Sequence, residues 1–301
     1  PQEAPLELII QPDDGMGPLK DAIDGAQKTV DLVIYELDDP VIEQSLVNAK
    51  NRGVEVRVIL QNINNFGRRP NQKAYDFLKS QGVPIIWAQK YFALTHQKTL
   101  VIDGAVAFVM TFNLMDKYYS SSRDFGLIVS DQKDVSAIKA AFDSDWLGKQ
   151  EVAGNGSDLV WSPGAAPTLL AFINSAETSL DIYALLMNDE RIVSALKEAA
   201  GRGVAVRLNM TYATSWKKVL GELVLAGVNV RTYPSTAKFF IHAKVMIADG
   251  KRAVISSQNF STPSLDLNRE LGILLSRPDI IDELEKTFDK DWLGSRPFVV
   301  K

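Results

Sequence analysis

Both histidines of this chain stand in the same short pattern, His-x-Lys-x4-Asp. A Lys and an Asp at those two positions would follow a histidine by chance about once in 300. In each copy an Asn follows the histidine by 17 residues, and an acid follows it by 28. The two sets are His96, Lys98, Asp103, Asn113 and Asp124, and His242, Lys244, Asp249, Asn259 and Glu270.

These side chains, brought together from both copies, suit the chemistry of a phosphate diester. One imidazole can attack phosphorus while the other protonates the leaving oxygen. The two lysines and two asparagines can hold the equatorial oxygens, where charge spreads during phosphoryl transfer. Each acid can accept a hydrogen bond from an imidazole, which fixes its tautomer and raises its basicity. We therefore predict catalysis without a metal ion or other cofactor by His96, Lys98, Asn113, Asp124, His242, Lys244, Asn259 and Glu270.

With this duplicated motif, the chain resembles the phospholipase D superfamily, and within it the bacterial phospholipases D and cardiolipin synthases. The resemblance implies a covalent phosphohistidine on His96, with His242 as the general acid. It also implies that each downstream acid contacts the histidine of the other half. Asp103 and Asp249 would support the fold, and Asp-Gly is typical of a turn. Tyrosyl-DNA phosphodiesterases of the superfamily lack this aspartate, which argues against that group.

The segments before the two asparagines depart from the family pattern, which usually has Gly-Ser two or three residues earlier. The chain has Met-Thr-Phe at 110–112 and Ser-Ser-Gln at 256–258. The glycine is missing from both, but hydroxyls remain at Thr111 and Ser257, and we expect these two to bind substrate. The unequal acids, Asp124 and Glu270, indicate different roles for the two histidines.

An internal repeat must supply the elements that position the two motifs. Residues 51–54 read Asn-Arg-Gly-Val, and residues 201–204 read Gly-Arg-Gly-Val, an offset of 150. From the motifs to the Asp-Trp-Leu-Gly segments at 145–148 and 291–294 the offset is 146. This constant offset indicates one fold in both halves, with the first about five residues longer within 61–81. Apolar residues at i, i+4 and i+7 predict a helix in each half; they are Ile42, Leu46 and Ala49, and Ile192, Leu196 and Ala199.

Each half is predicted to alternate strands and helices, then to form a hairpin and a closing helix. The expected strands are 29–36, 54–60, 99–103 and 105–109, and 179–186, 204–210, 245–248 and 253–256, with closing helices at 134–146 and 279–292. This order predicts the α/β class, as two tandem, similar α/β sandwich domains with mixed sheets. We expect a pseudo-twofold relation, an active site at the interface, and repeats at residues 1–150 and 151–301, divided by the glycine-containing segment 149–157.

Composition narrows the function further. The chain has no cysteine and two histidines, which excludes disulfides, zinc–thiolate sites, iron–sulfur clusters and three-histidine metal sites. The chain has no run of 18 consecutive apolar residues, so the sequence predicts no membrane-spanning helix. The formal net charge is −4, whereas non-specific nucleic-acid binders usually carry a basic excess. Because the chain begins at Pro1 and lacks cysteine, we expect a processed, secreted or periplasmic protein, and a cytoplasmic location stays open.

Substrate specificity must come from residues around the motifs. Tyr91 and Phe92 precede the first motif, Phe239 and Phe240 precede the second, and we expect all four at the pocket mouth as substrate-binding residues. An apolar rim suits acyl chains or an interfacial substrate, although aromatic rings also stack on bases. The same place is expected for Leu114, Met115, Tyr118 and Tyr119.

The leading interpretation is therefore a monomeric phospholipase D-type phosphodiesterase, which hydrolyses or transfers the phosphatidyl group of a phospholipid at a membrane or micelle surface. Nucleic acid is the less favoured partner, and a metal-independent nuclease of the same superfamily is the alternative enzyme. A non-catalytic binding module on the same fold is a third alternative, but the intact motifs in both halves argue against it.

Overall fold

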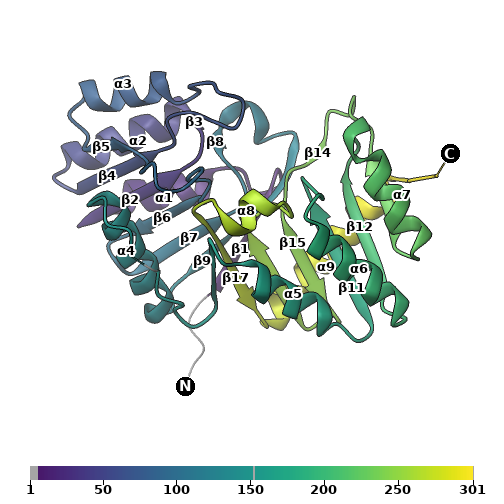
Figure 1. Cartoon of the computed structure of the whole chain (residues 1–301). Helices are drawn as coiled ribbons and strands as arrows, with labels where there is room; N and C mark the ends of the chain where they lie inside the picture. Colours follow the sequence, from purple (N-terminus) through teal and green to yellow (C-terminus); the bar gives the residue numbers. More distant parts are fainter. Residues whose placement is uncertain (1–5, 152, 301) are drawn as a thin grey trace.

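The computed structural model describes residues 6–151 and 153–300 of the 301-residue chain. Each half forms a mixed sheet with helices packed on it, and the two halves lie side by side (Figure 1). This arrangement confirms the predicted class of two tandem, similar α/β domains.

The first sheet has the strand order β1-β9-β7-β6-β2-β4-β5, with β14 of the second half also paired to β9. Strands β2, β4 and β5 run parallel, and the β6–β7 hairpin and β9 add antiparallel pairs. The elements are β1 (Leu6–Gln11), α1 (Gly17–Gly25), β2 (Thr29–Ile34), β3 (Leu37–Asp38), α2 (Pro40–Asn51), β4 (Glu55–Leu60), α3 (Gln72–Ser80), β5 (Ile85–Trp87), β6 (Thr99–Ile102), β7 (Val106–Met110), β8 (Leu114–Met115), η1 (Asp116–Tyr118), β9 (Ser122–Val129) and α4 (Gln132–Trp146).

The second sheet repeats this topology in the order β10-β17-β16-β15-β11-β12-β13-β18. Its elements are β10 (Leu159–Ser162), α5 (Ala166–Asn174), β11 (Ser179–Ala184), α6 (Glu190–Gly201), β12 (Ala205–Thr211), η2 (Thr214–Trp216), α7 (Lys217–Leu225), β13 (Asn229–Tyr233), β14 (Phe240–Ile241), β15 (Val245–Ala248), β16 (Arg252–Ser256), α8 (Thr262–Asp266), β17 (Glu270–Leu275), α9 (Pro278–Gly294) and β18 (Arg296–Pro297). The expected strands and closing helices are confirmed, with ends shifted by a few residues.

The two helices predicted from apolar spacing are α2 and α6, and each begins at an aspartate. The side chain of Asp39 accepts hydrogen bonds from the backbone N–H groups of Val41 and Ile42, and Asp189 does the same for α6. The apolar residues that predicted these helices are all buried, and each set lies in a hydrophobic core formed within its own half. Among the described residues, no helix combines the length and apolar character that a membrane crossing requires.

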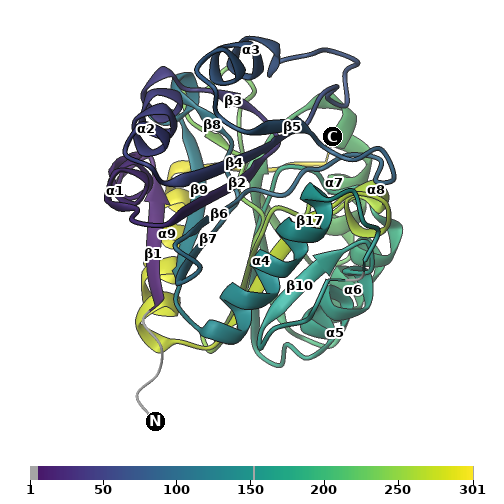
Figure 2. The same ribbon diagram turned by 90° about the vertical axis from the view of Figure 1, so that its left-hand side faces the viewer.

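A shared core between the two sheets joins the halves. Side chains of β6, β7 and β9 from the first half pack there with those of β15, β16 and β17 from the second. Helices α4 and α9 also contribute to this core, and Figure 2 shows α4 beside the second half. Because close-packed interiors resist sliding, this core holds the halves in one relative position. A site built from both halves requires such a fixed position.

The aspartates that end the two motifs stabilise an equivalent turn in each half. Asp103 and Asp249 adopt the left-handed backbone conformation, with φ of 55° and 57°. The Asp249 carboxylate accepts hydrogen bonds from the backbone N–H groups of residues 177–179, and the Asp103 carboxylate accepts them from residues 27–29. Burial acts in the opposite direction, but these N–H groups lower the pKa of Asp249 to about 2.

Replacing Asp249 should therefore destabilise the fold without altering the active site. We expect Asp249→Ala to lower the free energy of unfolding by about 1–3 kcal/mol, because three N–H groups lose their acceptor. The difference in unfolding free energy between the variant and the wild type should have its full size above pH 4. It should shrink as the pH falls toward 2, where Asp249 of the folded wild type becomes protonated. Urea unfolding at several pH values measures this effect, with exposed Asp21→Ala as the control. Equal stability of the two variants at pH 7 would contradict the turn-stabilising role.

Candidate active site

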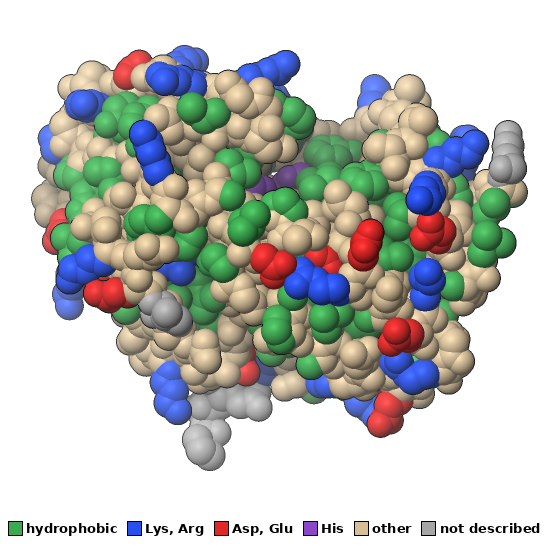
Figure 3. Space-filling model, viewed as in Figure 1, with side chains coloured by type: hydrophobic (Ala, Val, Ile, Leu, Met, Phe, Trp, Pro, Cys, Tyr) green, Lys and Arg blue, Asp and Glu red, His purple; other side chains and the backbone are tan. Residues whose placement is uncertain are grey.

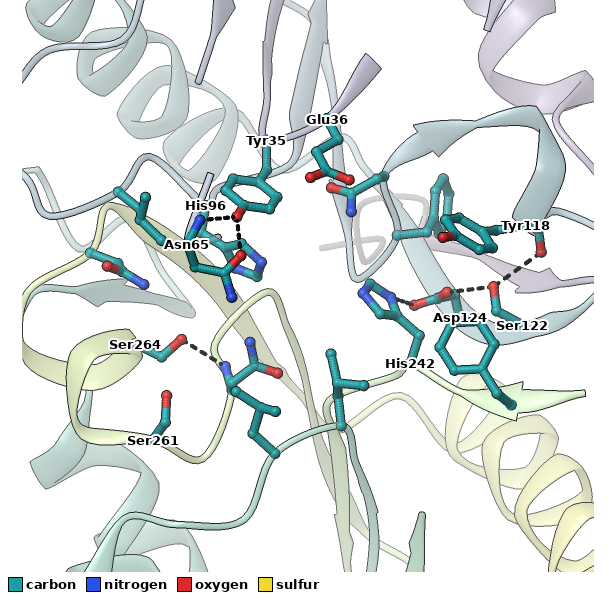
Figure 4. Close-up of a pocket in the computed structure, with 18 of the residues that line it drawn as sticks. Tyr35, Glu36, Asn65, His96, Tyr118, Ser122, Asp124, His242, Ser261 and Ser264 are labelled. Carbon is teal, nitrogen blue, oxygen red and sulfur yellow. Dashed lines mark hydrogen bonds and ion pairs between the residues drawn. The ribbon is translucent and has the colours of Figure 1, made fainter. Parts of the chain in front are cut away.

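The two motif histidines meet because each half's motif is joined to the sheet of the other half. Residue 242 follows β14, which pairs in parallel with β9, and the N–H of His242 donates to the carbonyl of Arg123 at 3.2 Å. In the first half the N–H of His96 donates to the carbonyl of Arg269 at 2.9 Å. Asp124 follows Arg123 in β9, and Glu270 follows Arg269 as the first residue of β17. Each histidine is thereby placed beside the acid of the opposite half (Figure 4).

Each imidazole is bound to one buried carboxylate. Nδ1 of His96 lies 2.7 Å from Oε2 of Glu270, and Nδ1 of His242 lies 2.8 Å from Oδ1 of Asp124. These distances match the contact across halves that the family resemblance implied. A proton on Nδ1 in this bond leaves Nε2 with the free lone pair, which is the form that a nucleophile or base requires.

The two carboxylates are themselves oriented by hydroxyl and amide donors. Glu270 accepts hydrogen bonds from Ser264 and, at 3.0 Å, from the side-chain amide of Asn268. Asp124 accepts them from Thr111 and, at 3.0 Å, from Ser122. Both acids are fully buried, so the bonds hold each carboxylate in a single orientation toward its imidazole.

The hydroxyls of Thr111 and Ser257 do not reach substrate space, so their predicted substrate-binding role is wrong. Both side chains are completely buried. The Thr111 hydroxyl accepts from the N–H of Phe125, and the Ser257 hydroxyl accepts from the N–H of Leu271 at 3.1 Å. Because these hydroxyls satisfy backbone groups of β9 and β17, they support the strands that carry the acids.

The motif lysines are buried, are not among the residues that line the cavity, and form no ion pair with a carboxylate of the described residues. Nζ of Lys98 donates to the carbonyl of His96 at 2.7 Å, and Nζ of Lys244 donates to the carbonyl of His242 at 2.5 Å. Burial lowers the pKa of Lys98 to about 7, helped by the charge of Lys244, and lowers that of Lys244 to about 8. An anion such as phosphate in the cavity would favour the charged form of both lysines.

The asparagines Asn113 and Asn259 line the same cavity, as predicted for phosphate-binding groups. The side-chain Oδ1 atom of each is buried and has no hydrogen-bond partner within the described residues. An Oδ1 atom accepts hydrogen bonds, so a donor on a ligand can pair with it, whereas the Nδ2 group of each side chain is the one that can donate to a phosphate oxygen. In the described parts of the chain, no three His, Asp or Glu side chains gather in a way that could hold a metal ion.

The cavity measures about 510 Å³ and lies at the junction of the halves. In the space-filling view the histidines are visible at the bottom of a hollow, and hydrophobic side chains gather around it (Figure 3). Of the residues expected at its mouth, Phe240, Tyr118 and Tyr119 line the cavity. Leu114 and Met115 are buried in β8 and do not line it.

Three of the four aromatic residues expected to bind substrate lie elsewhere, and that prediction is wrong for them. The Tyr91 hydroxyl donates to the carbonyl of Lys149 at 2.9 Å. The Phe92 and Phe239 rings pack beneath guanidinium groups, at 5.0 Å from Arg269 and 5.4 Å from Arg123. Since neighbouring residues of an extended segment point to opposite sides, only one of Phe239 and Phe240 can face the cavity.

Several residues that the motifs did not indicate also line the cavity. Tyr35 and Glu36 follow β2, and Leu185 and Leu186 take the same repeat positions after β11. The Tyr35 ring lies 4.5 Å from the imidazole of His96, and its hydroxyl donates to Asn65. The repeat offset of 150 could have identified these positions, because it pairs residues 35 and 36 with residues 185 and 186. Residues that follow the carboxyl ends of parallel strands gather at one edge of a sheet, where ligands bind.

Comparison with known proteins settles the family. The family model described as "Cardiolipin synthase, PLD-like domain" matches the chain twice, at residues 19–146 and 169–292. The chain belongs to the phospholipase D superfamily. It is 30% identical over 235 residues to the cardiolipin synthase of Geobacillus kaustophilus, covering 65% of this chain and 46% of that one. It is 24% identical over 345 residues to a cardiolipin synthase of Listeria monocytogenes, covering 98% of this chain and 70% of that one.

The phospholipase D fold extends over the described halves together. Phosphatidylserine synthase of Haemophilus influenzae superposes with a TM-score of 0.78 at 11% identity, over 97% of this chain and 87% of that one. Polyphosphate kinase of Porphyromonas gingivalis gives a TM-score of 0.73 at 16% identity, over 94% of this chain and 46% of that one. These likenesses show a common fold. The chain spans about half the length of the Geobacillus cardiolipin synthases that it matches.

Proposed function

We propose that the chain is a phospholipase D-type phosphodiesterase, which cleaves or transfers the phosphatidyl group of a phospholipid through a covalent phosphohistidine. The observation that carries the proposal is the pair of imidazoles, each bound through Nδ1 to a buried carboxylate of the opposite half. The side-chain amide N–H groups of Asn113 and Asn259, which line the cavity, and the charges of the two buried motif lysines suit the non-bridging oxygens of a diester.

In the proposed reaction Nε2 of His96 attacks phosphorus, a P–N bond forms, and the P–O bond to the leaving alcohol breaks. His242 gives its proton to that oxygen. His242 then removes a proton from the incoming water or alcohol, whose oxygen displaces His96 and releases the product. The lysine charges and the Asn113 and Asn259 amides stabilise the charge on phosphorus in both steps. Because one chain supplies both histidines, a monomer suffices.

The phospholipid assignment is supported by the cavity walls and by the named activities of the relatives. The cavity lining includes Leu185, Leu186 and Phe240, which suit an apolar glycerolipid. At the mouth the Phe66 side chain is 75% exposed and that of Tyr118 is 41% exposed. Arg68 and Arg69 are exposed beside Phe66 and form no ion pair with described residues. An exposed aromatic ring beside free cations suits a lipid surface with anionic head groups.

A parallel assay tests the function. Wild-type protein in EDTA should hydrolyse glycerol, ethanolamine or choline phospholipids in mixed micelles, and it should leave single- and double-stranded DNA intact. An added primary alcohol should divert part of the product to the phosphatidyl alcohol if the enzyme is a transferase. Robust DNA cleavage without lipid turnover would overturn the phospholipid assignment in favour of a nuclease. Loss of activity in EDTA that one divalent ion restores would overturn the metal-independent mechanism.

The exposed ring at the cavity mouth should matter for aggregated lipid alone. We expect Phe66→Ser to lower turnover of phospholipid vesicles about tenfold, because an interfacial aromatic side chain is lost. Hydrolysis of soluble bis(4-nitrophenyl) phosphate should stay within about twofold of the wild type. Leu225→Ser, which removes an equally exposed apolar side chain from α7, is the matched control. Equal losses on vesicles and on the soluble ester would contradict an interfacial role.

The rate should depend on pH as a bell whose limbs belong to the coupled histidines and lysines. Burial lowers the pKa of both histidines, so the neutral nucleophile persists below the ordinary value of about 6.5 and the acid limb should lie below it. On the alkaline side kcat/KM should first fall where His242 loses the proton that it must donate, because burial lowers its pKa as well, and it should fall further near pH 7–8, where Lys98 and Lys244 lose their charges. The alkaline limb of kcat should lie higher, because bound phosphate favours the charged lysines. A flat kcat/KM between pH 4 and 9 would contradict this mechanism.

A further inference from the structure

The catalytic groups of the cavity are duplicated, but its walls are not. Tyr35 and Glu36 follow β2, whereas Leu185 and Leu186 occupy the equivalent positions after β11, and all four line the cavity. A symmetric set of catalytic groups cannot distinguish the two ester bonds of a diester. The difference between a carboxylate on one wall and a leucine on the other can make that distinction.

Glu36 is a carboxylate that the proposed mechanism does not use. Its Oε1 accepts one hydrogen bond, from the side-chain amide of Asn64 at 3.1 Å, and no described cation pairs with it. Figure 4 shows the Glu36 side chain pointing into the cavity that contains both histidines. Its negative charge acts on Lys98, whose ammonium it stabilises. The carboxylate therefore lies within electrostatic reach of the site proposed for phosphate.

A carboxylate beside a phosphate site repels the substrate unless the substrate carries a group that binds it. An alcohol hydroxyl or an ammonium can donate to the free carboxylate oxygen, and such charge-assisted bonds are among the stronger ones. The neighbouring phosphates of a DNA strand would instead be repelled. Glu36 thus favours a diester with a hydrogen-bond donor close to phosphorus.

We propose that Glu36 selects the head group, accepting hydrogen bonds from donors on the alcohol portion of the phospholipid, while the leucine wall contacts its apolar portion. The inference rests on the proposed phospholipid activity and names which part of that substrate each wall binds. It makes Glu36 a specificity residue that contacts substrate without taking part in proton transfer. Glycerol and ethanolamine head groups both supply the required donor.

The test compares head groups that differ in donors. Phosphatidylglycerol, phosphatidylethanolamine and donor-free phosphatidylmethanol are assayed in the same mixed micelles with the full chain. Glu36→Gln removes the charge and keeps the shape and the acceptor for Asn64, whereas Glu36→Leu copies the other wall. We expect kcat/KM on a donor-bearing lipid to fall about tenfold in Glu36→Gln and further in Glu36→Leu, with phosphatidylmethanol within about twofold. Exposed Glu55→Gln is the control and should change none of the rates.

The outcomes separate the alternatives. A selective loss on phosphatidylglycerol alone identifies a hydroxyl, and one on phosphatidylethanolamine alone identifies an ammonium; either supports the proposal. Equal changes on all three lipids in Glu36→Gln would overturn it and indicate a general effect on catalysis or folding. Wild-type protein that hydrolyses bis(4-nitrophenyl) phosphate but none of the lipids would instead overturn the proposed function, and the head-group role with it.

Discussion

His96→Ala should lose turnover of every phosphodiester, at least about 10⁴-fold, because no nucleophile remains. His242→Asn should lose ordinary diesters about 10²–10⁴-fold, since an alkoxide is hard to expel unprotonated. A 4-nitrophenyl ester leaves as a stabilised phenolate and needs little help from an acid. His242→Asn should therefore still release one equivalent of nitrophenol and then stall as the phosphohistidine, because His242 also activates the incoming water.

Rapid-mixing absorbance at enzyme concentrations comparable to substrate measures the burst, and mass spectrometry under alkaline conditions detects the phosphohistidine. The two variants control for each other, because each removes one imidazole from an equivalent position. A burst and a phosphohistidine in His96→Ala, with neither in His242→Asn, would show that the roles are reversed. The absence of both from both variants would contradict a covalent intermediate on either histidine.

The second large effect on catalysis should come from replacing the two carboxylates that bind the histidines of the opposite halves. Glu270→Gln keeps the shape of the side chain but weakens the bond that holds Nδ1 of His96, so it should slow formation of the phosphohistidine about 10²–10⁴-fold. Asp124→Asn acts on His242 instead and should preserve most of the nitrophenol burst. Both acids are positioning residues, since each acts through an imidazole.

A structural role alone would not produce this division between the two steps. In the wild type, proton NMR should show a downfield Nδ1–H resonance for each histidine, and Glu270→Gln should move only that of His96. Asp31→Asn is the control, because Asp31 is also buried and charged but pairs with Arg57 away from the cavity. Loss of the burst in Asp124→Asn with a normal burst in Glu270→Gln would reverse the assignment of the two acids.

The amino-acid sequence by itself determined the fold class and the set of candidate catalytic residues. Two copies of one motif at a constant offset require two copies of one local structure, because equivalent side chains must occupy equivalent places in the hydrogen-bonded strands. The α2 and α6 helices were predictable for the same reason, since their apolar spacing matches the helical period. The turn at Asp249 was predictable from its Asp-Gly pair, since these residue types accept the required backbone conformation.

Only the tertiary structure decided which groups face the cavity. Whether Phe239 or Phe240 points inward depends on which sheet β14 joins, and β14 joins β9 of the other half. The hydroxyl of Thr111 is drawn to Asp124 and a strand N–H, which spacing along the chain cannot show. The repeat already paired Glu36 with Leu186, but only the structure showed that both residues line one cavity, where their difference can affect substrate binding. These outcomes depend on how two similar halves pack against each other, and packing is a property of the folded molecule that local sequence patterns do not contain.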